Sequence, residues 1–278
     1  MPFILGLITS FSLPPYNFVI ISFITFPLLF IFFVDNYKNN KFVAFKIGWF
    51  FGFGYFISNI YWITHSLTFD DLFKSLIPFA LIIIPSFLAI FYGLITFLSS
   101  FFDLKKNVST IIIFTIIFSA IEFFRGNILG GFPWNLTVYS WSNNIIFLQI
   151  LSLVGTYTLN LLSITLFLIP AILLFKKTKK IKVFFLISSA ILLLSNYIYG
   201  SVVVRNSEKL NDKNLNFTIK IISPKIDINR FYELSNSEKI LKELIKISKP
   251  DSMEKTIFIF PEGVLTNIYL EEIDLYKK

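Results

Sequence analysis

The residues best suited to chemistry lie near the end of the sequence, where a short apolar run meets a carboxylate. Residues 257–263 read IFIFPEG, a strand-like segment that leads directly into Pro261 and Glu262. In α/β folds, ligands and catalytic groups gather at the carboxyl ends of strands. Glu262 is therefore a candidate general base, the role in which a carboxylate removes a proton from a reacting group. The alternative is that Glu262 is a surface carboxylate in an ordinary turn. Taken by itself, the Pro-Glu pair favours this alternative.

A second group of candidates lies in the loop 122–144, the longest connection in the apolar part of the chain. Its sequence is EFFRGNILGGFPWNLTVYSWSNN. Phe132, Trp134 and Tyr139 are aromatic side chains of the kind found at the boundary between bilayer and water. The glycines and the proline between them supply unusual backbone torsions. The loop is either an ordinary aromatic belt or a platform that holds a lipid substrate.

Glu122 and Arg125 lie three residues apart at the end of a predicted span and so share one helix face. Because charged groups at membrane depth are costly unless paired, we expect a structural ion pair. The alternative is that Arg125 binds a lipid phosphate. His65 is the only histidine and there is no cysteine, so the sequence predicts no metal site and offers no thiol nucleophile. No nucleotide-binding glycine motif occurs, and we expect no cofactor.

The composition indicates an integral membrane protein. The chain is 55% hydrophobic with a mean hydropathy of +0.72, and only 15% of its residues are charged, against about 25% in soluble domains. Residues 1–200 hold 12 Lys/Arg and 5 Asp/Glu, a balance of +7 out of the total of +8. A basic excess within the apolar part is a signal of membrane topology, so we expect no nucleic-acid partner.

The hydrophobic pattern predicts a transmembrane bundle of about seven spans in residues 1–200. The segments are 2–13, 18–34, 43–63, 75–102, 108–124, 145–175 and 183–200. The first is short for a span, which needs about 20 residues. Every second connecting loop is rich in lysine, which predicts that those loops face the cytoplasm. Everything after residue 200 then lies outside, whether or not the first segment crosses the membrane.

The remaining residues predict a linker at 201–216 and an incomplete outer domain at 217–278. Strand-like runs at 217–223 and 256–260 flank a segment with helical spacing at 233–249. This β-α-β order implies a parallel pair of strands with a helix packed on it. A short helix-like segment follows at 268–276. The predicted fold class is therefore a polytopic α-helical membrane bundle followed by the opening β-α-β part of an α/β domain.

Five motifs occur in a distinctive order along almost the whole chain. They are FSLPPYNF (11–18), GWFFGFGYFISNIYW (48–62), EFFRGNILGGFPWNLTVYS (122–140), the strand at 217–223 and FPEGVL (260–265). Together they resemble the amino-terminal part of the apolipoprotein N-acyltransferases, members of the nitrilase or carbon–nitrogen hydrolase superfamily. The resemblance implies a bacterial inner-membrane, multi-pass enzyme whose nitrilase-like (αββα) domain lies on the periplasmic side.

The resemblance also implies a reaction. An acyl chain passes from a phospholipid to the α-amino group of the diacylglyceryl-cysteine of a lipoprotein, through a thioester on a cysteine. A glutamate acts as base and a lysine stabilises the oxyanion. By position, Glu262 matches the glutamate, and Phe231 stands where a tryptophan is expected. Arg125, Phe132, Trp134, Tyr139 and Phe231 are the implied lipid-binding residues, and we expect a monomer.

This sequence departs from the family pattern because no residue matches the lysine or the cysteine. Gly263 also replaces the small hydroxyl residue that follows the glutamate in the family. We therefore expect residues 1–278 to be the front of a longer enzyme and inactive alone. One alternative is a non-enzymatic lipid-binding or transport protein, which predicts charged groups near the middle of its spans. Another is a truncated reading frame that never folds productively.

Overall fold

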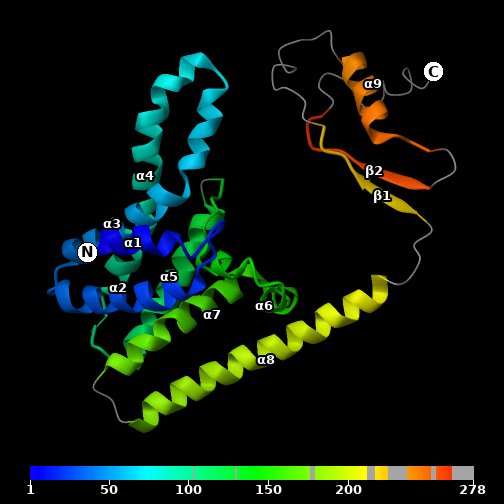
Figure 1. The fold of residues 1–278 in the computed structure, drawn as a ribbon. Coiled ribbons are helices and arrows are strands. Elements are labelled where there is room, and N and C mark those ends of the chain that lie inside the picture. Colours follow the sequence, from blue (N-terminus) through cyan, green and yellow to red (C-terminus); the bar gives the residue numbers. More distant parts are fainter. Residues whose placement is uncertain are drawn as a thin grey trace. The chain divides into compact units, whose positions relative to one another are not determined.

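The computed structural model describes residues 1–278 except 103, 129, 176–178, 212–216, 225–236, 252–254 and 265–278, and it leaves out the side chains of 208–211, 237 and 238. The chain divides into two compact units, Met1–Ser207 and Glu208–Lys278. The first unit is helical and the second contains the strands (Figure 1). Each has its own cluster of buried apolar side chains, so each is described by itself.

The first unit consists of α-helices joined by short 3-10 segments (η). Asparagines at 40, 107 and 144 cap the first turns of α3, α5 and α6, because their side-chain oxygens accept backbone N–H groups there. The elements are α1 (Pro2–Ser10), η1 (Val19–Ile21), α2 (Ser22–Asn36), α3 (Lys41–Asn59), η2 (Tyr61–Thr68), η3 (Asp71–Leu76), α4 (Ile77–Ser99), α5 (Val108–Asn127), η4 (Thr137–Trp141), α6 (Ile145–Leu148), α7 (Leu151–Leu174) and α8 (Lys179–Asn211).

The described helices fit a multi-pass membrane protein. Five are long and apolar enough to cross a membrane, and the bent pair α3–η2 would make a sixth. The sequence predicted about seven spans because it included the segment 2–13. Helix α1 in that segment has nine residues, about 14 Å of helix, which is too short for a hydrocarbon core of about 30 Å.

Helix α3 packs closely against α1 and α4 at glycines of the GWFFGFG motif. A Cβ atom on Gly54 would lie 2.2 Å from the carbonyl oxygen of Phe3 in α1. A Cβ atom on Gly48 would lie 2.2 Å from the carbonyl oxygen of Tyr92 in α4. Small residues at such contacts let helix backbones approach one another within a membrane. The motif therefore serves the packing of three helices.

Replacing Gly48 by alanine is expected to lower the free energy of unfolding by about 1–3 kcal/mol, the usual cost of overpacking. The new methyl group would meet the Tyr92 carbonyl oxygen at 2.2 Å and Thr96 Oγ1 at 2.3 Å. The α3–α4 contact must then open, which strains the hydrogen bond of 2.7 Å from Thr96 Oγ1 to the Ala44 carbonyl. Unfolding in mixed detergent micelles, followed by circular dichroism, measures the change.

Gly93→Ala in α4 is the matched control for this substitution. The three atoms nearest to a Cβ atom on Gly93 all belong to the ring of Phe45, the first at 2.6 Å, and a side chain can turn away where a backbone cannot. Both variants gain up to about 1 kcal/mol of helix propensity, so that term cancels between them. Equal destabilisation by the two would contradict the assignment of Gly48 to a backbone contact.

The core of the first unit is aromatic. The ring of Phe26 in α2 lies 6.1 Å from Phe51 in α3, 5.6 Å from Phe118 in α5 and 5.7 Å from Phe167 in α7, measured between centroids. All four side chains are buried. Such tilted and edge-to-face pairs add to the packing that joins the helices. One phenylalanine thus connects four of the helices that carry the loops.

Helix α8 touches the rest of its unit at few points. Only 6% of its most apolar 18-residue stretch is buried. Asn196 Nδ2 donates to the carbonyl oxygen of Phe147 at 3.2 Å, and Gly200 approaches the carbonyl oxygen of Ile146 closely. The helix continues to Asn211, so much of the predicted linker 201–216 is helical. Hydropathy falls after Val204, but a helix satisfies its own backbone hydrogen bonds and does not need apolar side chains.

The second unit contains a two-stranded parallel sheet formed by β1 (Thr218–Ile221) and β2 (Thr256–Ile259). Helix α9 (Ser237–Ser248) lies between them in the sequence, and its Ile240 and Leu244 cluster with Val264. The order strand, helix, strand and the parallel direction agree with the prediction. Two strands are common to many α/β folds, so the nitrilase-like nature of the domain stays a prediction. The segment 268–276 lies outside the described residues.

Candidate functional site

Three segments that are distant in the sequence line one cavity of about 470 Å³ in the first unit. They are the turn after α1, the junction of α3 with η2, and the loop between α5 and α6. None of the lining side chains is charged. Five are aromatic, namely Tyr16, Tyr61, Trp62, Trp134 and Tyr139. An apolar cavity of this size with a few polar groups is typical of a small-molecule site.

Each segment belongs to one of the motifs noted in the sequence, at 11–18, 48–62 and 122–140. Trp134 and Tyr139, two of the expected lipid-binding residues, both line this cavity. Phe132 is not among the lining residues and instead packs, partly buried, against the helical core. Because residues of all three motifs line the same cavity, the motifs are placed to bind one ligand together.

The aromatic side chains remain largely accessible. Trp62 and Trp134 meet edge to face with centroids 5.9 Å apart, and they keep 47% and 55% of their surface exposed. Tyr61 is 63% exposed. Large amphipathic rings grouped on a surface mark an interaction site or a membrane boundary. The cavity mouth can therefore receive a ligand that is partly apolar.

Polar groups accompany the rings, among them those of Asn135 and Tyr139. Asn135 has a left-handed backbone (φ 57°), and its carbonyl oxygen accepts a hydrogen bond of 3.1 Å from the Tyr55 hydroxyl. Its side-chain Oδ1 is buried without a hydrogen-bond partner among the described residues. A buried acceptor is costly when unpaired, so this oxygen can receive a donor from a ligand. Burial raises the pKa of the Tyr139 hydroxyl above its ordinary value, which keeps it a neutral donor.

Arg125 holds the loop that carries these residues. Its Nη1 donates to the carbonyl oxygens of Phe132 and Trp134, both at 2.8 Å. Its Nη2 lies 3.7 Å from Glu122 Oε1, and both side chains are fully buried. This is the geometry of the structural ion pair, and the lipid-binding role of Arg125 stays a prediction.

Glu122 joins the loop to two further helices. Its Oε1 accepts from the Tyr92 hydroxyl of α4 at 3.0 Å and from Thr137 Oγ1 of η4 at 3.4 Å. Its Oε2 accepts from Asn160 Nδ2 of α7. Asn160 Oδ1 in turn accepts the backbone N–H of Val138 at 2.8 Å. A buried carboxylate needs such partners, because unpaired charge in a low dielectric is very costly.

Sequence reasoning found the Glu122–Arg125 pair but missed Tyr92 and Asn160. Tyr92 lies 30 residues from Glu122 in sequence and Asn160 lies 38 away. Each is one of several polar side chains in a long apolar helix, and neither forms a motif. Their polarity within a span was the one available signal, because such groups are normally paired inside a bundle.

The predicted catalytic residue lies in the second unit. Glu262 is exposed in the turn that follows β2, at the carboxyl end of that strand. Phe231 lies outside the described residues. His65 is exposed, and its ring meets Phe69 with centroids 5.5 Å apart. Within the described ranges, no group of three or more His, Asp or Glu side chains could hold a metal ion.

Comparison with known proteins gives a consistent result. Residues 5–169 match the apolipoprotein N-acyltransferase N-terminal domain. Proteins named apolipoprotein N-acyltransferase from Brucella melitensis and Agrobacterium fabrum are 26% and 28% identical over 283 and 282 residues, which is 96% and 97% of this chain and 52% of each relative. One from Rhizobium rhizogenes is 31% identical over 177 residues, 60% of this chain and 33% of the relative. The chain spans about half the length of the first two relatives.

Proposed function

The chain belongs to the apolipoprotein N-acyltransferase family, and from this premise we propose that it is the membrane part of such an enzyme together with the start of its catalytic domain. The proposed reaction transfers an acyl chain from a phospholipid to the α-amino group of the diacylglyceryl-cysteine of a lipoprotein. The proposed setting is the bacterial inner membrane, with residues after the last span on the periplasmic side. We propose that the protein acts as a monomer.

The observation that carries the proposal is the meeting of three family motifs around one uncharged aromatic cavity. A phospholipid and a lipid-modified protein both present apolar chains next to polar headgroups. Trp62 and Trp134 offer apolar surface to a chain, while the free Asn135 oxygen offers an acceptor to a headgroup donor. The buried Glu122–Arg125 network fixes the loop in advance, which reduces the entropy lost when a ligand binds.

The chemical step is proposed to use Glu262 as general base. Its position at the carboxyl end of β2 supports this role, since that edge is where α/β folds place reacting groups. A thioester requires a thiol, and the 278 residues contain no cysteine. The nucleophile and the oxyanion lysine are therefore proposed to come from residues that are not part of this sequence. Lys225 and Lys255 precede Glu262 and are not assigned to either role.

A chimera tests the proposed function. Residues 1–278 are joined to the part of the Agrobacterium fabrum relative that lies beyond the matched region, and the product is expressed in cells depleted of their own N-acyltransferase. We expect N-acylated lipoproteins to reappear, detected by mass spectrometry of their amino-terminal peptides. The intact relative serves as the positive control. A chimera that inserts into the membrane but leaves lipoproteins diacylated would overturn the proposal.

Replacing Trp134 by alanine is expected to weaken phospholipid binding about five- to thirtyfold, since the lost burial of an aromatic ring corresponds to roughly 1–2 kcal/mol. Binding is measured by photo-crosslinking of a diazirine-labelled phosphatidylethanolamine to the purified chain. Phe79→Ala removes an aromatic ring that is 63% exposed on α4 and does not line the cavity. Equal loss in both variants would show that exposed rings bind lipid without regard to the cavity.

A further inference from the structure

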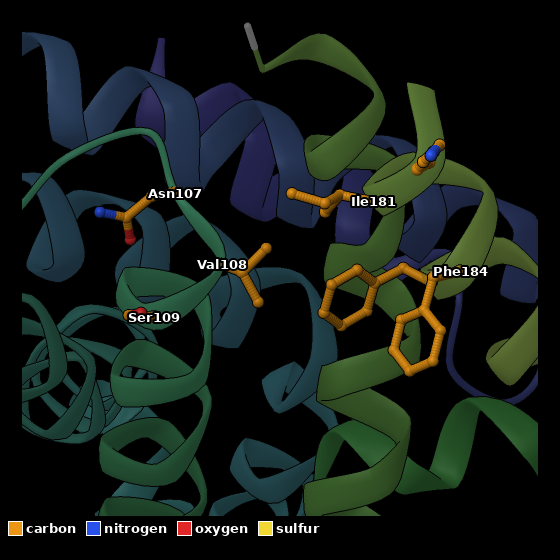
Figure 2. Close-up of a pocket in the computed structure, with 7 residues that line it drawn as sticks. Asn107, Val108, Ser109, Ile181 and Phe184 are labelled. Carbon is orange, nitrogen blue, oxygen red and sulfur yellow. The ribbon is translucent and has the colours of Figure 1, made fainter. Parts of the chain in front are cut away.

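A second cavity, of about 510 Å³, separates the first turn of α5 from the first turns of α8. It shares no residue with the aromatic cavity. Figure 2 shows Val108 of α5 on one side and Ile181 and Phe184 of α8 on the other. The cavity exists because α8 contacts its unit at few points and leaves a wedge beside α5. Within a bilayer, such a wedge opens toward lipid.

The mouth of this cavity is basic. Lys180 lines it, together with the exposed hydroxyl of Ser109. The neighbouring Lys182 donates to the carbonyl oxygen of Leu173 at 2.6 Å, which fixes one further cation near the start of α8. Lys106, just before α5, pairs with Asp35 at 2.7 Å. The sequence adds Lys179, Lys180 and Lys182 at the start of α8, whereas Asp103 lies before α5.

The amino-terminal end of α5 is not proposed as the anion-binding group. The side-chain oxygen of Asn107 already accepts the backbone N–H of Thr110 at 2.8 Å and its hydroxyl at 2.9 Å. The positive charge therefore comes from side chains, above all Lys180. Apolar walls and a cation at one mouth match the two parts of an anionic amphiphile.

We propose that this cavity binds one anionic phospholipid, with its phosphate at Lys180 and an acyl chain between Val108 and Phe184. Basic pockets between transmembrane helices characteristically hold anionic headgroups. The acyl chain would fill the wedge that protein atoms leave empty, and so would fasten α8 to α5. The lipid is thus a structural ligand that stabilises the position of the last span, separate from any lipid that reacts.

The test compares dioleoyl-phosphatidylglycerol with dioleoyl-phosphatidylcholine as the ligand of the purified chain, counted as adducts by native mass spectrometry from detergent. We expect one retained phosphatidylglycerol and no comparable phosphatidylcholine. Lys180→Gln should weaken that adduct about fivefold, the factor that corresponds to about 1 kcal/mol for one cation at an anionic surface. Lys38→Gln is the matched control, because Lys38 is exposed in another basic loop and does not line the cavity.

A second pair of variants tests the apolar half of the site. Phe184→Ala should weaken the adduct, whereas Ile187→Ala, at a similarly exposed position of α8 outside the cavity, should not. Both side chains are more than half exposed, so neither variant is expected to unfold the chain. Equal losses for Lys180→Gln and Lys38→Gln, no loss for Phe184→Ala, or displacement of the lipid by millimolar inorganic phosphate would each overturn the proposal.

Discussion

Replacing Arg125 by alanine is expected to lower the free energy of unfolding of the bundle by about 3–5 kcal/mol, the usual result of removing one partner from a buried ion pair. The substitution leaves the fully buried Glu122 carboxylate without its cation. It also removes both hydrogen bonds that hold the carbonyl oxygens of Phe132 and Trp134. Unfolding of the purified chain in mixed micelles, followed by circular dichroism, measures the effect.

Lys106→Ala is the matched control for Arg125→Ala. Lys106 forms an ion pair of 2.7 Å with Asp35, but both side chains are more than 40% exposed. Such exposed pairs contribute about 0–1 kcal/mol, so this variant should differ little from the parent. A loss below 1 kcal/mol for Arg125→Ala as well would show that the buried pair does not hold the loop.

Arg125→Lys separates charge from geometry. A lysine keeps the positive charge beside Glu122 but lacks the planar group that reaches two carbonyl oxygens at once. We expect an intermediate loss of stability and a stronger effect on lipid crosslinking at Trp134, because the loop rather than the ion pair is released. Full recovery of both properties would mean that only the charge of Arg125 matters.

The sequence was informative about this site where the chemistry of a side chain left few alternatives for its surroundings. Glu122 and Arg125 could be paired in advance because two charges on one helix face at membrane depth have few alternatives. The chemistry of their rings also made Trp134 and Tyr139 candidates for lipid contact, and both line the aromatic cavity. Their meeting with Trp62 could not be foreseen, because it depends on how α3 and the loop after α5 fold together.

The differences between the hydrophobic segments and the helix bounds have a similar origin. Hydropathy measures how favourably a side chain enters lipid. It carries no information about the residue at which the hydrogen-bonded helix ends. It therefore counted the segment 2–13 as a possible span, although α1 ends at Ser10, and it ended the last span at 200, although α8 continues to Asn211. The partial alternation of β1 and the helical spacing of α9 gave better results, since periodicity reports the geometry of the element itself.

Glu262→Gln in the chimera is expected to lower the rate of lipoprotein N-acylation by about 10²–10⁴, the usual contribution of a general base. Glutamine keeps the size and hydrogen-bonding capacity of the side chain but cannot take up a proton. Because Glu262 is exposed in the turn after β2, the exchange should leave folding of the second unit intact. The rate is followed by the loss of diacylated and gain of triacylated amino-terminal peptides in purified chimera.

Glu243→Gln is the matched control for Glu262→Gln. Glu243 is an exposed carboxylate of α9 in the same unit, so its removal changes the local charge equally. If both variants retain the parent rate, Glu262 is a surface carboxylate and the base lies elsewhere. A loss confined to Glu262→Gln, in a chimera whose second unit remains folded by circular dichroism, identifies Glu262 as the base.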